Sequence, residues 1–248
     1  MEGIIIVNKP QDWTSFDVVA KIRNLTGIKK VGHSGTLDPM ATGVLPVFIG
    51  RSATKMIDQF IGGDKGYLAE MTLGVKTDTL DATGKVLEMS NAQCPISNDG
   101  IVTILNNYKG EIEQIPPMFS AKQINGQRLY KLARKGIEVE RKPCKIKIYE
   151  LRLTPIVSPL ATGSRITLDI LCSKGTYIRQ LVSDIGDDLG CGAHLSKLER
   201  TYAQPFHISQ AINMETIITL AKHGKLDTII IKPEDILTPA AFGGHPSP

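Results

Sequence analysis

The sequence contains no apolar run long enough to cross a bilayer. Its longest runs, Ile4 to Val7 and Ile229 to Ile231, are far shorter than the roughly 20 residues that a membrane-spanning helix needs. The N-terminal residues also lack the basic start and the apolar stretch of a secretory signal peptide. These absences favour a soluble protein of the cytoplasm that has no membrane partner.

Cysteines are few and scattered along the chain. The four residues are Cys94, Cys144, Cys172 and Cys191. They form no CxxC pair and stand at no zinc-ligand spacing from a histidine. We therefore expect free thiols in a reducing compartment, and no metal site.

Charge is moderate overall but unevenly distributed. The 248 residues are 42% hydrophobic and 22% charged, which is ordinary for a soluble globular protein with a real core. The net charge is +4, yet residues 122–152 alone hold ten Lys/Arg and three Glu, a local charge of +7. Such a basic block is typical of a surface that binds a polyanion, and a merely solvated surface is the alternative.

Strand and helix patterns are interspersed without a regular βαβ repeat. Alternation of apolar residues predicts strands over 3–7, 67–75, 85–88, 146–153 (with a phase slip) and 166–172. Helical spacing predicts helices over 15–27 with Ser15 as N-cap, 97–108, 126–135, 177–189 and 214–223. This order predicts an α+β fold with a mixed sheet. The Pro/Gly-rich residues 238–248 have no core pattern and are predicted to form a short tail.

The densest chemical signal is the glycine-rich segment 32–45, GHSGTLDPMATGVL. Backbone amides of such a loop can bind phosphate. However, the segment matches neither GxxxxGK[ST] nor GxGxxG, which argues against a nucleotide-binding enzyme. Asp38, which precedes Pro39, would on its own be interpreted as a turn residue.

Taken whole, this segment resembles the catalytic motif of the TruB family of tRNA pseudouridine-55 synthases, G-H-T-G-x-L-D-P, whose aspartate is the nucleophile. Ser34 replaces the more usual threonine, and Glu199 stands where arginine is commoner. The resemblance continues through VNKP (7–10), KGY (65–67), TDTLDATG (77–84), PPMFSA (116–121), GTYIR (175–179) and the GAHL and LER segments between 192 and 200.

The resemblance implies an isomerase that converts uridine to pseudouridine at position 55 in the T loop of tRNA. This rearrangement gains and loses no atoms, so it needs no cofactor. The implied fold is a catalytic domain over 1–237, with a mainly antiparallel sheet flanked by helices. It also implies a basic RNA-gripping insertion at about 109–147 and no full C-terminal PUA domain. The implied partner is the tRNA T-arm, bound by a monomer without an obligate protein partner.

By resemblance, the catalytic residues are Asp38, Tyr67 and Arg179. The substrate-binding residues are His33, which would fill the place of the flipped base, Tyr177, Leu198, Arg134, Lys135 and Lys9, the last as a support for the catalytic loop. A cation beside Asp38 would keep this carboxylate ionised in a partly dry pocket, and Arg179 fits that role. If the chain around it is extended, Tyr177 and Arg179 point to the same side.

Several alternatives remain open. Outside the motifs, Tyr67 and Leu198 would be core residues, His33 a satisfied polar residue and Arg179 part of a surface ion pair. An RNA-binding or RNA-folding protein with secondary catalysis would also explain the basic block. The sequence leaves both C1′ and C6 of the uridine as the atom that Asp38 attacks.

Overall fold

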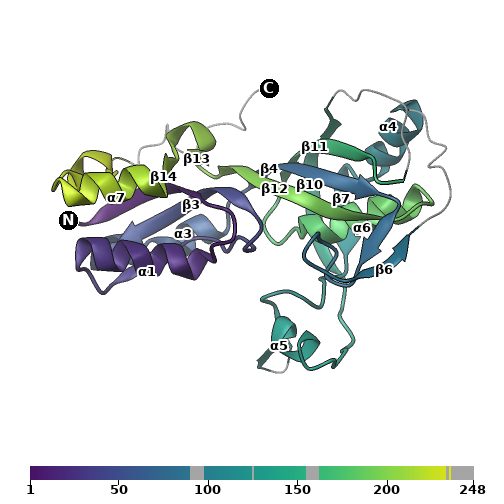
Figure 1. Cartoon of the computed structure of the whole chain (residues 1–248), viewed down its shortest axis with the longest axis horizontal. Helices are drawn as coiled ribbons and strands as arrows, with labels where there is room; N and C mark the ends of the chain where they lie inside the picture. The colour runs from purple at the N-terminus through teal and green to yellow at the C-terminus, as the bar shows by residue number, and fades with distance from the viewer. Residues whose placement is uncertain (90–97, 125, 155–161, 233–234, 236–248) are drawn as a thin grey trace. The chain divides into compact units, whose positions relative to one another are not determined.

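A computed structural model describes residues 1–89, 98–124, 126–154, 162–232 and 235 of the chain (Figure 1). The chain forms two compact units, one of Met1–Tyr67 with Glu199–Pro248 and one of Leu68–Leu198. Within the described ranges, no helix is long and apolar enough to span a membrane.

The first unit is built around a sheet in the strand order β14-β1-β3-β12. Its strands are β1 (Gly3–Lys9), β2 (Val31–His33), β3 (Thr42–Ile49), the last part of β12 (Ala193–Ala203), β13 (Phe206–His207) and β14 (Ile212–Asn213). Its helices are α1 (Ser15–Thr26), α2 (Gly50–Thr54), α3 (Ile57–Ile61), α7 (Met214–Lys222) and the 3-10 turns η1 (Ile208–Gln210) and η2 (Leu226–Ile229). Strand β1 runs antiparallel to β3 and places Lys9 opposite Gly43, at the end of the glycine-rich loop.

The unbroken apolar run of β1 is explained by burial on both faces of the sheet. Ile5 and Val7 belong to a cluster that includes residues of α1 and α7. Ile4 and Ile6 belong to a second cluster that contains Phe60. Because successive side chains of a strand point to opposite faces, a strand covered on both sides has no polar alternation.

Helix α1 begins one residue earlier than its predicted cap implies. Thr14, not Ser15, is the N-cap: its hydroxyl accepts from the Asp17 amide, and the Asp17 carboxylate accepts from the Thr14 amide. This reciprocal pair is a capping box. The end was predicted correctly, since Gly27 caps the helix with a φ of 70°. Ser15 is instead buried, and its hydroxyl forms hydrogen bonds with the backbone of the glycine-rich loop.

The second unit has a sheet in the order β12-β4-β11-β10-β7. Its strands are β4 (Lys65–Leu73), which begins in the first unit, β5 (Val75–Thr77), β6 (Val86–Met89), β7 (Gly110–Gln114), β10 (Cys144–Leu153), β11 (Arg165–Cys172) and the first part of β12. Its main helices are α4 (Asn98–Asn107) and α6 (Ile178–Asp188). The predicted phase slip of β10 is confirmed, because its register against β11 shifts between Ile148 and Glu150.

The chain between β7 and β10 forms a small substructure. It consists of the hairpin β8 (Gln123–Ile124) and β9 (Gln127–Arg128), followed by helix α5 (Leu129–Ala133). Leu129 and Leu132 are buried as predicted. The helix is shorter than the predicted 126–135, because Gly126 and the two residues after it belong to the hairpin. The predicted insertion limits, 109–147, include β7 and the first residues of β10, and its RNA-gripping role stays a prediction.

The predicted fold class, α+β with a mixed, mainly antiparallel sheet and helices, is confirmed. Most predicted strands and helices occur within a few residues of their expected limits. The helix predicted over 177–189 is present as α6, with Tyr177 as its extended N-cap. Arg179 lies in the first turn of that helix, so the condition of an extended chain through Arg179 is not met. Ser97 and the tail 238–248 lie outside the described residues, and the domain limit at 237 stays a prediction.

Candidate active site

Asp38 lies half-buried in the loop between β2 and β3. Two anchors hold the chain on either side of it. The Ser15 hydroxyl donates to the carbonyl of Leu37 (3.2 Å) and accepts from its amide (2.9 Å). The carbonyl of Pro39 accepts from the Asp12 amide at 2.8 Å and from the Lys9 ammonium at 3.1 Å. The backbone of the predicted nucleophile is thus fixed before any substrate binds.

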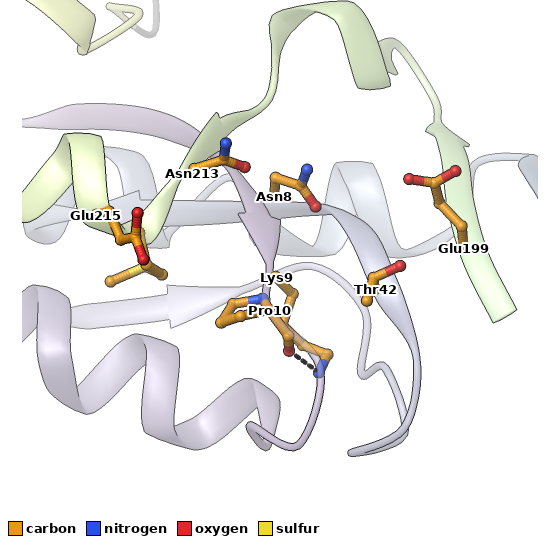
Figure 2. A pocket seen from close by; sticks show the side chains of 8 residues that line it. Asn8, Lys9, Pro10, Thr42, Glu199, Asn213 and Glu215 are labelled. Atoms are coloured by element: carbon orange, nitrogen blue, oxygen red, sulfur yellow. Dashed lines mark hydrogen bonds between the residues drawn. The ribbon is translucent and has the colours of Figure 1, made fainter. Parts of the chain in front are cut away.

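Lys9 is completely buried, which is unusual for a lysine. Its ammonium also donates to the carbonyls of Pro10 (2.8 Å; Figure 2) and Trp13 (2.6 Å). An ammonium has three donors, and all three are used within the protein. Burial lowers the pKa of Lys9 to about 8, against the opposing effect of nearby carboxylates, Asp38 among them. This geometry fits the expected role of Lys9 as a support for the loop.

Arg200, on β12, is a central residue of this site that the sequence analysis did not select. Its side chain is only 1% exposed. The guanidinium donates to the carbonyl of Val44 at 2.7 Å and to that of Gly35 at 3.1 Å. Burial lowers the pKa of Arg200, and the nearby phenol of Tyr67 opposes that shift.

The glycine that follows the loop is required by the same arginine. A Cβ on Gly43 would lie 2.2 Å from the carbonyl oxygen of Arg200, and its φ is +100°. Both facts exclude a side chain there. In the sequence, the LER segment was the only signal for Arg200, because arginine side chains are usually exposed and strand β12 was not predicted.

Tyr67 and His33 complete the predicted residues of the first unit. Tyr67 lies on β4 with a 9% exposed side chain. The ring Nδ1 of His33 accepts from the Gly35 amide at 3.2 Å. Burial, and then the charge of Arg200, lower the pKa of His33. The imidazole is therefore neutral at neutral pH.

Arg179 lies in the second unit, in the first turn of α6, and is 7% exposed. Its guanidinium donates to the carbonyls of Thr79 (3.1 Å) and Phe119 (2.6 Å) and lies 3.6 Å from the carboxylate of Asp81. That carboxylate accepts from the hydroxyl and amide of Thr83. The TDTLDATG segment therefore supplies the buried carboxylate that pairs with Arg179. The expected ion pair between Arg179 and Asp38 joins residues of different units and stays a prediction.

The remaining predicted residues also lie in the second unit. The backbone of Tyr177 exchanges two hydrogen bonds with the side-chain amide of buried Gln114, at 2.8 and 3.1 Å. Leu198 is 7% exposed on β12. Arg134 and Lys135 are exposed at the end of α5, where the Arg134 guanidinium stands 5.5 Å from the ring centre of Tyr130. These positions leave the expected binding roles untested.

A cleft of about 400 Å³ lies beside the end of β1. It is lined by Asn8, Lys9, Pro10, Thr42, Glu199, Asn213, Met214 and Glu215, with the two glutamates at opposite ends (Figure 2). Among the predicted site residues, only Lys9 borders it. The two carboxylates disfavour a phosphate in this cleft, and Asp38 does not line it. Within the described residues, no group of three His, Cys, Asp or Glu side chains is arranged to hold a metal ion.

Comparisons with known proteins agree with these motifs. A family model for the N-terminal domain of TruB family pseudouridylate synthases matches residues 23–178, and one for the C-terminal domain of tRNA pseudouridylate synthase B matches residues 179–239. The chain is 51% identical to tRNA pseudouridine synthase B of Clostridium tetani, over 88% of this chain and 73% of that protein. It is 42% identical to the Geobacillus thermodenitrificans protein of the same name, over 96% and 78%.

A solved structure also resembles the chain. A chain in the crystal structure of a Cbf5-Nop10-Gar1 complex matches with a TM-score of 0.69 and 30% identity. The match covers 92% of this chain and 56% of that one, so this chain spans little more than half of its structural relative.

Proposed function

Since this chain belongs to the TruB family of pseudouridylate synthases, we propose that it isomerises the uridine at position 55 in the T loop of tRNA, with Asp38 as the nucleophile. Isomerisation of uridine to pseudouridine is the reaction of this family. The observation that carries the proposal is the fixed loop: a half-buried Asp38 between backbone groups that Ser15 and Lys9 hold.

The reaction breaks the bond from C1′ to N1, turns the base and joins C1′ to C5. A carboxylate accelerates such a step by bonding to the substrate. Glycoside hydrolysis uses a second carboxyl to protonate the leaving oxygen. Uracil leaves as a delocalised anion, so one aspartate is enough. The anchored loop keeps Asp38 in a single geometry, which lowers the entropic cost of the attack.

Arg179 is the proposed cation for Asp38. Two carbonyls and Asp81 orient its guanidinium, so the fork is fixed in place before a substrate arrives. A guanidinium favours the ionised form of a nearby carboxylate. Ionised Asp38 is the form that attacks.

The substrate base must leave the RNA stack to reach Asp38. His33 suits the space that the base leaves, because its imidazole is neutral and planar and carries no charge that would need water. Tyr67 suits stacking on the extruded base. The exposed cations of the chain between β7 and β10, Arg134 and Lys135 among them, suit phosphate contacts that recognise the T-arm by its shape.

Mapping the product on an unmodified tRNA transcript tests this function. Carbodiimide treatment followed by primer extension should show a new stop for position 55 only after incubation with the protein. A transcript with cytidine at position 55 is the matched control and should show none. A stop at another uridine would contradict the assigned position, and no new stop anywhere would contradict the activity.

A further inference from the structure

Cys144 lies in contact with the side chain of Lys122, and the proposed reaction uses neither residue. The Lys122 Nζ stands 2.6 Å from the Cys144 Sγ. Cys144 is half-buried, whereas Cys172 and Cys191 are buried, with 0% and 6% of their surface exposed. Cys94 lies outside the described residues. Among the described thiols, Cys144 is therefore the most accessible to a solute.

The surroundings of this thiol are electropositive. Lys142 and Lys145 lie close to Cys144 in the sequence and are exposed, and residues 122–152 carry the local charge of +7. Within the described residues, no carboxylate pairs with Lys122, and the thiol is its side-chain partner. Partly exposed cysteines beside a cation are the ones that oxidants modify, because the thiolate is the reactive form.

Both residues are held by the backbone around them. Cys144 is the first residue of β10 and lies opposite Gln114 of β7. Lys122 directly precedes β8, and its carbonyl accepts from the amide of Leu129, the first residue of α5, at 2.9 Å. The two side chains are 22 positions apart in the sequence. A bond between them would close the chain that carries β8, β9 and α5 into a covalent loop.

We propose that Cys144 and Lys122 form a redox-sensitive pair, in which hydrogen peroxide oxidises the thiol and the lysine amine captures the product. The Cys144 thiolate attacks one peroxide oxygen and the O–O bond breaks, which gives a sulfenic acid and hydroxide. The hydroxide takes the extra proton of the Lys122 ammonium and becomes water. The amine nitrogen then attacks the sulfenic sulfur, and the hydroxyl leaves with one amine proton as a second water. Sulfur loses two electrons, peroxide gains two, and the product is an S–N crosslink.

The test treats the folded protein with hydrogen peroxide and identifies its peptides by mass spectrometry after free thiols are blocked. The expected product joins the Lys122 and Cys144 peptides and is lighter than their sum by two hydrogen atoms. Dithiothreitol should return it to two separate peptides. Sulfinic or sulfonic acid at Cys144 without a crosslink would overturn the inference, and so would equal oxidation of buried Cys172 and Cys191.

Substitution of the lysine separates capture from simple oxidation. Lys122→Arg keeps a cation beside the sulfur but lacks the amine nucleophile, so this variant should lose the crosslink. Dimedone, which labels sulfenic acids, should then mark Cys144 more strongly than in wild type. A crosslink to Cys144 in Lys122→Arg, or equal dimedone labelling of the two proteins, would overturn the assignment of the pair.

Two further variants are the matched controls. Lys145→Arg makes the same change at the exposed lysine next to Cys144, and it should form the crosslink as wild type does. Cys144→Ser should form none. Loss of the crosslink in Lys145→Arg would contradict a specific role of Lys122. The assay contains no tRNA, so its result is independent of the proposed function.

Discussion

Lys9 shows how a single buried charge can hold the backbone of a loop. Its ammonium binds three carbonyls, one of them next to Asp38. Burial removes the charged ammonium from water and so lowers the pKa of Lys9 to about 8. The loop therefore depends on a proton that is lost within an accessible pH range.

We predict that kcat/KM falls as the pH rises through about 8. Below this value Lys9 is an ammonium with three donors, and above it the neutral amine has only two, so one carbonyl loses its partner. Lys9→Met should be slower at all pH values and destabilised by roughly 1–3 kcal/mol, the cost of an unsatisfied buried acceptor. Its profile should lack the change near pH 8. The same alkaline loss in Lys9→Met would assign the titration to another group.

At the residue scale, the sequence identified the motif but not the residue that organises it. Asp38, Tyr67 and His33 stand in recognisable segments. Arg200 stands in the LER segment, but its role was not predicted, because it depends on burial against Gly35 and Val44, which lie more than 150 positions earlier in the chain. Likewise, the exchange of Ser15 and Thr14 as N-cap follows from the contact of Ser15 with Leu37, which local propensity does not contain.

At the scale of elements, periodicity predicted the helices α1, α4, α6 and α7 and the strands β1, β4, β10 and β11, because these bury apolar positions at a regular spacing. The long strands β3 and β12 were not predicted. The predicted start of α6 at Tyr177 is correct to within one residue, and the structure gives its physical reason. Buried Gln114 bonds both backbone groups of Tyr177 and so fixes the helix start from a distant strand. The predicted range of α5 was too long. Its basic residues are good helix formers and suggested a helix from Gly126, but Gly126 has a positive φ and lies in a turn.

At the scale of elements, the testable prediction concerns tRNA binding by the chain between β7 and β10. Exposed Lys131, Arg134, Lys135 and Lys142 are free of ion pairs within the described residues, whereas Arg141 pairs with Glu138 at 2.9 Å. Neutralising the four exposed cations together should weaken tRNA binding. It should also reduce the slope of log K against log salt by roughly 3, at 0.7–0.9 per lost phosphate contact.

A control variant with the same change of net charge at other positions separates the effect of position from the effect of net charge. Lys29, Lys30, Lys222 and Lys225 are exposed lysines of the first unit. Their neutralisation should leave the slope closer to that of wild type. Equal slopes for the two quadruple variants would show that this segment is not the RNA-gripping surface. Binding titrations over a series of salt concentrations give both values.

At the scale of the whole molecule, the predicted residues are divided between two units. Lys9, His33, Asp38 and Tyr67 belong to the first unit, and Arg179 to the second. Strands β4 and β12 each contribute residues to both units. The resemblance of the sequence motifs predicted the family correctly. The division into two units was not predicted, because it depends on the density of tertiary contacts and not on motif order.

The most direct test of the central claim is tritium release from T-arm RNA labelled at C5 of uridine, with wild type and Asp38→Asn side by side. Asp12→Asn, an exposed acid in the neighbouring turn, is the matched control. We predict release by wild type and Asp12→Asn, and none by Asp38→Asn, with tRNA affinity within a few-fold for all three. Release by Asp38→Asn at the wild-type rate would contradict the assignment of Asp38 as the nucleophile.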